Sequence, residues 1–197
     1  MSDEKRQYTK TRRAESEAMT RAKIAECTAQ LHGTVGPSRT TISAIAKLAG
    51  VRRSTVYRHF PDEAALFDAC SAHWRALHPV PDIGKWAAIS DPDKRLAIGL
   101  REMYVFYHGT GRMYDNLFRD EPIVPTVKAK FKAFRGFIAT ACDVLMVGRP
   151  RRKREQVAAA IGHAIAFPTW RSLVREQGLD DDQAAALMCR MVAAASE

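Results

Sequence analysis

The stretch TTISAIAKLAGVRRSTVYRHF, residues 40–60, decides the fold of the N-terminal part of the chain. Its apolar side chains recur three or four positions apart on both sides of Gly50, as in two short amphipathic helices. Glycine at the junction permits the positive φ that a tight turn requires. The pattern predicts short helices over about residues 41–48 and 52–60, with Thr40 or Thr41 as the N-cap of the first. Together these two helices form a helix-turn-helix.

The second predicted helix buries Val56 and Phe60 and leaves a face that is rich in hydrogen-bond donors and nearly free of acids. Such a face suits the major groove of DNA. The residues that we expect to bind DNA are Thr40, Thr41, Arg52, Arg53, Ser54, Thr55, Tyr57, Arg58 and His59. The two adjacent arginines can reach guanine edges, and Ser54 and Thr55 can touch bases near the helix start. The threonine pair, the tyrosine and the histidine suit phosphate oxygens.

The rest of the chain shows helical periodicity almost throughout, and no segment alternates as a half-buried strand does. Glycine and proline residues separate the helical segments. We expect further helices over about residues 14–32, 62–78, 92–108, 111–119, 123–147, 152–176 and 181–195. Pro168 should kink its helix or lie at a break. The fold class is therefore all-α, with an N-terminal three-helix helix-turn-helix module joined to a C-terminal helical bundle.

Charge is unevenly distributed along the chain, whose net charge is +9. Residues 1–60 hold 12 basic and 5 acidic side chains, whereas residues 61–197 hold 19 and 17. This excess near the N-terminus favours a polyanion as partner. A basic arm with Lys5, Arg6, Lys10, Arg12 and Arg13 either follows a DNA backbone, enters a minor groove or remains a solvated leader.

Signals of catalysis, metal binding and membrane insertion are missing from the sequence. It has no Gly-rich phosphate loop, nucleophile elbow or metalloprotease motif, and its six histidines stand singly. The four cysteines, Cys27, Cys70, Cys142 and Cys189, form no C-x-x-C pair, so we expect reduced, buried thiols. We therefore expect no enzyme activity, no cofactor and no metal. With no signal-like start and no apolar run of about 18 residues, we expect a cytoplasmic protein without membrane contact.

The stretch AKLAGVRRSTVYRHFPDEAAL, residues 46–66, resembles the signature of the TetR family of bacterial transcriptional regulators. The similarity extends over about residues 14–70. Two positions depart from the family pattern. Ser54 stands where glycine is frequent, and Glu63 stands where a lysine that meets a phosphate is frequent. The second departure removes one expected contact to the DNA backbone.

The resemblance implies three parts of the chain with different roles. These parts are a flexible basic arm over residues 1–13, a helix-turn-helix DNA-binding domain over residues 14–61, and a helical ligand-binding and dimerisation domain over residues 62–197. In the family, two long helices at the C-terminal end pair across a two-fold axis. We expect such a homodimer here, because several alanines in residues 156–195 permit close packing against a partner. The alternative is that these helices pack only within one chain.

Large side chains with a few polar tips crowd the segment from residue 74 to residue 137. Each is either plain core or part of a mainly apolar pocket for a small effector, which is apolar or aromatic. The residues that we expect to bind this effector are Trp74, Met103, Tyr104, Tyr107, His108, Tyr114, Phe118, Phe134 and Phe137. A separate basic run, residues 149–154, is either a solvated loop or an additional contact to an acidic partner.

These observations predict a sequence-specific DNA-binding transcriptional regulator. The preferred reading is a ligand-responsive repressor that acts as a homodimer on a palindromic, double-stranded operator with half-sites about 34 Å apart or slightly more. The alternatives are a transcriptional activator with the same DNA-binding module and a helical adaptor that does not bind DNA.

Overall fold

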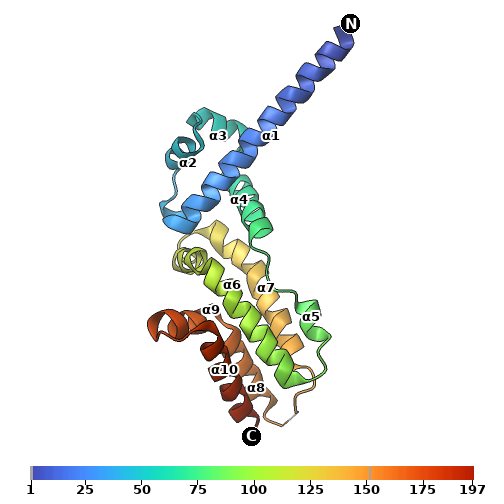
Figure 1. Cartoon of the computed structure of the whole chain (residues 1–197). Coiled ribbons are helices and arrows are strands. Elements are labelled where there is room, and N and C mark those ends of the chain that lie inside the picture. The colour runs from blue at the N-terminus through green and yellow to red at the C-terminus, as the bar shows by residue number, and fades with distance from the viewer. Residues whose placement is uncertain (1, 151) are drawn as a thin grey trace. The chain divides into compact units, whose positions relative to one another are not determined.

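The computed structural model describes residues 2–150 and 152–197, and the side chains of residues 2–6 and 9 lie outside this description. Lys5 and Arg6 of the expected basic arm, and Arg151 of the basic run, are among the residues whose side chains are not described. The described residues form helices, turns and loops without any strand (Figure 1). The expected all-α class is confirmed.

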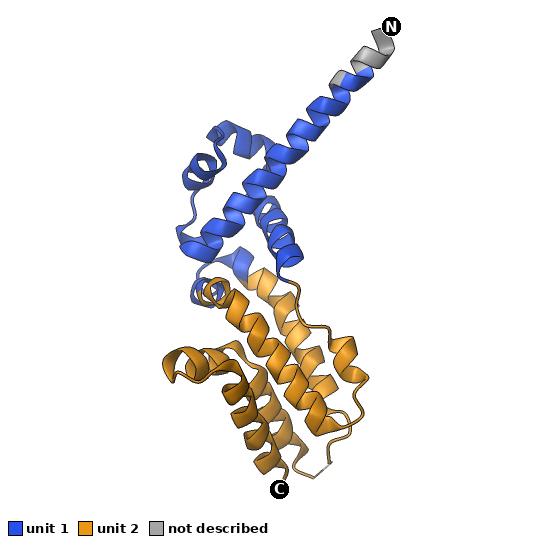
Figure 2. Cartoon of the chain, in the orientation of Figure 1, with its two compact units in different colours: residues 1–78, 116–127 blue, residues 79–115, 128–197 orange. Residues whose placement is uncertain are grey.

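Two compact units divide the chain, and each is described by itself (Figure 2). Unit 1 consists of residues 1–78 and 116–127, and unit 2 of residues 79–115 and 128–197. This division follows spatial proximity, and it leaves the predicted boundaries at residues 13 and 61 as predictions.

Unit 1 is built on a long first helix. Helix α4 packs against α1, and α2 packs against both α1 and α3. Its elements are α1 (Ser2–Thr34), the 3-10 turn η1 (Pro37–Arg39), α2 (Ile42–Ala49), α3 (Arg53–His59) and α4 (Glu63–Leu77). Apolar residues from these four helices form one core, made of Ile24, Ile45, Ala46, Val56, Phe60 and Leu66. The predicted helix-turn-helix is therefore present.

Local side-chain chemistry explains where α2 begins and ends. Thr41 is the N-cap, and its hydroxyl oxygen accepts a hydrogen bond from the Ala44 amide at 3.1 Å. Gly50 ends the helix with φ 69°, in the left-handed region, and its amide bonds back to the last turn. Both predictions from the sequence, a threonine cap and a glycine turn, are confirmed.

Helix α1 begins at Ser2, although the apolar pattern predicts a start near residue 14. Residues 2–13 are polar, but they include Glu, Lys, Arg and Gln and contain neither glycine nor proline. Residue types with high helix propensity extend a helix beyond its apolar face. Apolar periodicity therefore marks where this helix is buried rather than where it starts.

Unit 2 contains most of two long helices, with shorter ones around them. Its elements are α5 (Ile83–Ala87), α6 (Pro92–Asp120), α7 (Pro125–Met146), α8 (Arg154–Ile165), α9 (Phe167–Trp170), the π-helical turn η2 (Arg171–Glu176) and α10 (Asp181–Ser196). The last residues of α6 and the first of α7 belong to unit 1. Helices α8 and α10 pack against each other. Helix α5 was not predicted from the sequence.

The prediction of two helices over residues 92–108 and 111–119 is wrong, because α6 runs without a break. A glycine inside a helix costs only about 1 kcal/mol relative to alanine, so two glycines alone do not end one. Gly111 is buried, and a Cβ there would lie 2.9 Å from the Trp170 ring and would also meet Arg175. This glycine provides space for a neighbouring indole rather than a turn.

The segment predicted as a single helix over residues 152–176 is interrupted. Helix α8 ends at Ile165, Ala166 is extended, and Pro168 lies in the first turn of α9. Proline fits a helix start because its missing amide has no partner there. The expected break at this proline is confirmed.

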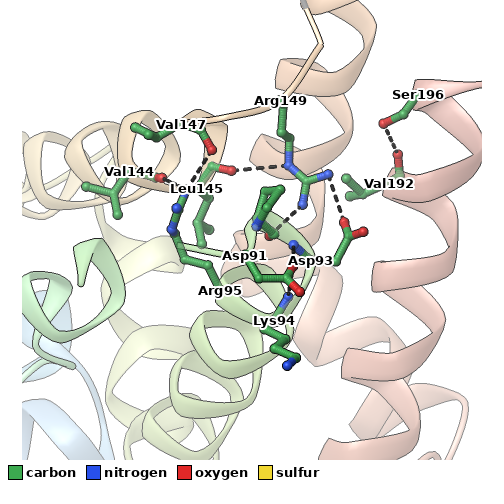
Figure 3. A network of polar contacts seen from close by, with 11 residues as sticks. Asp91, Asp93, Lys94, Arg95, Val144, Leu145, Val147, Arg149, Val192 and Ser196 are labelled. Atoms are coloured by element: carbon green, nitrogen blue, oxygen red, sulfur yellow. Dashed lines mark hydrogen bonds and ion pairs between the residues drawn. The ribbon is translucent and has the colours of Figure 1, made fainter. Parts of the chain in front are cut away.

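Two buried arginines link the start of α6 to the end of α7 (Figure 3). The guanidinium of Arg95 donates to the carbonyl oxygens of Ile89, Ser90, Val144 and Val147. Arg149 donates to the carbonyls of Leu145 and Pro92 and forms an ion pair with Asp93 at 3.2 Å. The basic run is thus not uniformly solvated, since its first member is a structural residue.

Candidate DNA-binding surface

Helix α3 separates a buried face from an exposed, donor-rich face. Val56 is fully buried and Phe60 at the C-cap is 2% exposed, so both anchor the helix in the core. On the other side Arg52, Arg53, Ser54, Tyr57 and Arg58 are exposed, and Thr55 is half-buried. Tyr57 is 51% exposed, so its ring is accessible on the same side of the helix. The structure thus brings most of the predicted recognition residues together on one exposed surface, which we call the α3 face.

The N-terminal end of this face is rich in donors. Arg52 is the N-cap of α3 and makes no side-chain cap bond, so its guanidinium is available to a ligand. No acidic side chain lies in the first turn of the helix. Free amide groups at a helix N-terminus and adjacent arginines both attract anions.

The two threonines before α2 differ in what their hydroxyl groups can do. Thr41 uses its oxygen as acceptor for the α2 cap, which leaves its O–H free to donate to a phosphate. Thr40 donates its O–H to the Gly36 carbonyl at 2.8 Å, so it meets a phosphate as donor only after that bond breaks. Of the two predicted phosphate contacts, Thr41 fits the geometry better.

His59 is the predicted DNA-binding residue that fits least well. It is half-buried, and its Nε2 is shielded from solvent and has no hydrogen-bond partner among the described residues. That nitrogen is therefore not presented to a phosphate in this conformation. Its role in DNA binding remains a prediction.

Arg21 of α1 supports the end of α3, which the sequence did not indicate. Its guanidinium lies 4.2 Å from the centre of the Phe60 ring and donates to the carbonyl oxygen of His59. A cation at a helix C-terminus is favourable because the last carbonyls carry partial negative charge. The interaction joins residues 38 positions apart, so no local pattern could have identified it.

A buried polar cluster fixes the loop between α1 and α2. Asp120 is fully buried, accepts from Arg119 at 2.8 Å and accepts from the Ser38 amide at 2.9 Å. Burial raises the pKa of Asp120, but the hydrogen bonds from Arg119 and Ser38 outweigh burial and hold the pKa below its usual value. The Arg119 side chain also donates to the Val35 carbonyl. This cluster, within unit 1, holds the turn that leads into the helix-turn-helix.

The predicted effector residues do not form one group. Trp74 and Phe118 belong to unit 1, and the other seven belong to unit 2. Within unit 2, Met103, Tyr104 and Tyr107 are fully buried. The Tyr104 hydroxyl donates to the Ala164 carbonyl at 2.7 Å, and the Tyr107 hydroxyl to that of Ile165 at 2.9 Å. The two tyrosines thus join α6 to the end of α8, and all three side chains are buried in unit 2.

The remaining predicted effector residues are placed differently. Tyr114 is buried against Phe134, with 4.8 Å between ring centres, and half-buried Phe134 stacks on Phe137. His108 is exposed and lies 3.0 Å from the Asp181 carboxylate. In unit 1, Trp74 is half-buried and stacks on His78. The effector site remains a prediction.

Comparisons with known proteins agree with this fold. Residues 24–70 match the family model described as bacterial regulatory proteins, tetR family. The search of curated proteins found no match. Across the described residues no helix is long and apolar enough to cross a membrane.

Several solved structures share the fold at low sequence identity. A transcriptional regulator from Rhodococcus sp. is 15% identical, with a TM-score of 0.60 over 87% of this chain and 95% of its own. A TetR transcription regulator from Haloarcula marismortui is 13% identical, with a TM-score of 0.57 over 91% of this chain and 97% of its own. NalD from Pseudomonas aeruginosa, a secondary repressor of the MexAB-OprM multidrug efflux pump, is 18% identical, with a TM-score of 0.58 over 91% of this chain and 96% of its own.

The fold of unit 1 and the α3 face are those of a helix-turn-helix domain of the DNA-binding kind. Over residues 24–70 the helix-turn-helix domain is similar to that of the tetR family of bacterial regulatory proteins. The resemblance seen in residues 46–66 is confirmed by this match.

Proposed function

We propose that this chain is a ligand-responsive repressor that binds a palindromic operator as a homodimer. The observation that carries the proposal is the α3 face, where cationic and hydroxyl side chains are exposed on a helix that Val56 and Phe60 anchor. Arg52 and Arg53 read base edges, and Thr41 and Tyr57 hold phosphates. Ser54 and Thr55 add short contacts near the start of the helix.

Helices α8 and α10 support the homodimer. They pack against each other, and each buries apolar residues, among them Val157 and Ile161 on α8 and Ala184 and Met188 on α10. Their outer sides expose small residues, namely Ala158, Ala159 and Ala186, and leave Gly162 half-buried. Small side chains let two helix pairs approach closely, so a second copy completes a four-helix interface.

Repression is favoured over activation by one of the similar structures, since NalD is described as a repressor. A repressor of this kind occludes a promoter while bound to its operator. The effector is a small apolar or aromatic molecule in unit 2, where Tyr114, Phe134 and Phe137 adjoin one another. A screen for ligands that raise the melting temperature tests this site, and a library that never shifts it counts against it.

Fluorescence anisotropy with labelled duplexes tests DNA binding. Duplexes from the DNA flanking the gene are compared with a random duplex of equal length at several salt concentrations. We expect Arg53→Ala to weaken the cognate palindrome by about 1–3 kcal/mol and to relax its sequence preference, whereas Tyr57→Phe weakens all duplexes alike. Lys85→Ala, which removes an exposed cation from α5, is the matched control. Equal losses on cognate and random DNA for Arg53→Ala contradict the base-reading role.

Sedimentation velocity tests the homodimer. The wild-type chain should sediment as a dimer at micromolar concentration, and Ala159→Glu should shift it toward the monomer, because a charge would then lie in the interface. A stable 22.0 kDa species for the wild type contradicts the homodimer.

A further inference from the structure

A cavity of about 320 Å³ lies inside unit 1, beside the α3 face. Helices α1 to α4 all contribute to its wall, with His32 from α1, Ile45 from α2, Tyr57 from α3 and Leu66 from α4. Its volume lies at the lower end of the range for small-molecule sites, which begins near 300 Å³. The cavity is separate from the effector site expected in unit 2.

The charge of this cavity is opposite to that of the surface around it. Asp62 and Glu63 line it, and none of its twelve described lining residues is Lys or Arg. Asp62 uses one carboxylate oxygen to cap α4, accepting from the Ala65 amide at 2.7 Å, and the other oxygen has no partner among the described residues. The exposed carboxylate of Glu63 has no described hydrogen bond or ion pair. Two carboxylates thus line a cavity to which no Lys or Arg contributes, while the Arg21 guanidinium lies on the Phe60 ring and bonds to the His59 carbonyl.

The inner wall is apolar and aromatic. Phe60, Leu66 and Phe67 are buried there, and the Tyr57 ring completes the wall near the α3 face. His32 is 7% exposed, and its Nε2 has no described partner, while Nδ1 lies 3.7 Å from the Cys70 sulfur. Burial lowers the pKa of His32 to about 4, so the ring is neutral at pH 7 and does not compete with a bound cation. Aromatic faces near carboxylates favour organic ammonium ions.

We infer that this cavity binds a small organic cation, with its apolar body among Ile45, Phe60 and Leu66 and its ammonium group beside Asp62 and Glu63. An alcohol of the same shape gains only the apolar contacts. A carboxylate of the same shape is repelled. Charge complementarity therefore distinguishes the occupant from a generic apolar ligand.

Occupation of this cavity should strengthen DNA binding, an extension that rests on the proposed function. Thr40 and Tyr57 line the same cavity and are predicted phosphate contacts. The two carboxylates repel a phosphate at this position, and a bound ammonium group cancels part of that repulsion. Because linkage is reciprocal, DNA should also raise the affinity for the cation.

Calorimetric titration of the full chain with three probes of one shape tests the site. The probes are phenethylammonium, 2-phenylethanol and phenylacetate. We expect saturable binding of phenethylammonium about fivefold tighter than that of 2-phenylethanol, and no binding of phenylacetate. Glu63→Gln should remove most of that preference and leave 2-phenylethanol binding unchanged. Glu15→Gln, which removes an exposed carboxylate from α1, is the matched control and should change nothing.

A second variant tests the cavity itself. Ile42 is a half-buried lining residue, and Ile42→Phe should fill the space and reduce the affinity for both binding probes at least fivefold. Equal affinities for the ammonium and the alcohol overturn the inference. The inference is also overturned if neither Glu63→Gln nor Ile42→Phe changes the affinity for phenethylammonium, because the probe then binds elsewhere.

Anisotropy with a random duplex tests the effect on DNA. Phenethylammonium chloride, compared with ammonium chloride at equal concentration, should tighten DNA binding at least twofold, and this gain should vanish in Glu63→Gln. A weakened or unchanged affinity overturns the coupling. The titrations need no DNA, so a failure of the proposed function and a failure of the cation site give different results.

Discussion

Replacing Arg95 should destabilise unit 2 far more than replacing an exposed arginine of the same helix. Arg95 is 3% exposed, and its guanidinium makes five hydrogen bonds to four backbone carbonyls. Figure 3 shows the bonds to Val144 and Val147. Two of these carbonyls, of Val144 and Val147, lie at the C-terminal end of α7; the Val144 carbonyl also accepts from the Val147 amide at 3.2 Å, whereas no backbone amide among the described residues donates to the Val147 carbonyl. The guanidinium thus supplies both the missing donors and the positive charge that a helix C-terminus favours.

The magnitude follows from what Arg95→Met would leave behind. Each buried acceptor without a partner costs about 1–3 kcal/mol, and carbonyls near the surface recover part of that cost by binding water. For the carbonyls of Val147, Ile89 and Ser90, which would keep no described partner, we expect a total loss of about 3–5 kcal/mol in the free energy of unfolding. Arg95→Lys keeps the charge but has only three donors on one atom, so it should lose about half as much.

Urea denaturation followed by circular dichroism measures this loss. All variants are compared at one protomer concentration, because a dimer's stability depends on concentration. Arg101→Met is the matched control, since Arg101 lies on α6, is exposed and pairs with Asp182; it should cost less than about 1 kcal/mol. If Arg95→Met does not fold, the stability loss of Arg95→Lys, compared with that of Arg101→Met, still tests the prediction. The reasoning is refuted if Arg95→Lys and Arg101→Met lose the same stability.

Three further predictions concern unit 1. Arg21→Ala should weaken binding to cognate and random duplexes alike by about 1 kcal/mol, because the C-terminal end of α3 loses its contact with the guanidinium. Fluorescence anisotropy measures this loss. Lys23→Ala, which removes a neighbouring exposed cation, is the control and should have a smaller effect. Gly50→Ala should lower the free energy of unfolding by about 1–2 kcal/mol, because a residue with a Cβ is strained at φ 69°. Gly36→Ala should cost more, because its added Cβ would also meet Arg119 and Asp120. Equal losses of the two variants in urea denaturation would contradict this reasoning. Because burial lowers the pKa of His32 to about 4, the unfolded chain takes up the proton first, so stability falls as the pH drops from about 6.5 to 4. His32→Phe should make that fall shallower, which urea midpoints measured across this range test; an unchanged fall contradicts the reasoning.

Local sequence patterns predicted the helix-turn-helix, but they gave wrong helix boundaries where contacts between residues far apart in the sequence determine the structure. The Thr41 cap and the Gly50 turn depend on neighbours within five positions, so the sequence indicates both. Gly111 reads as a helix end in sequence, yet its role depends on Trp170 packing against α6. The start of α1 lies beyond the apolar pattern because helix propensity alone extends it.

The same division holds for the functional residues. The α3 face follows from residue types and helical spacing, so the arginines and Tyr57 were identified correctly as exposed. Arg21 and Asp120 were missed because their partners lie 38 and 82 positions away. The aromatic residues of unit 2 could not be divided into core and effector site, since both uses require the same side chains at the same spacing.

The two sides of α3 also bear on how such a regulator can evolve. Val56 and Phe60 hold the helix in place, while Arg52, Arg53 and Ser54 contribute little to that core. Substitutions on the outer side should therefore be nearly neutral for folding, in contrast to those on the inner side. Descendants of this protein could acquire new target sequences through a few changes at these three positions, without any compensating change in the scaffold.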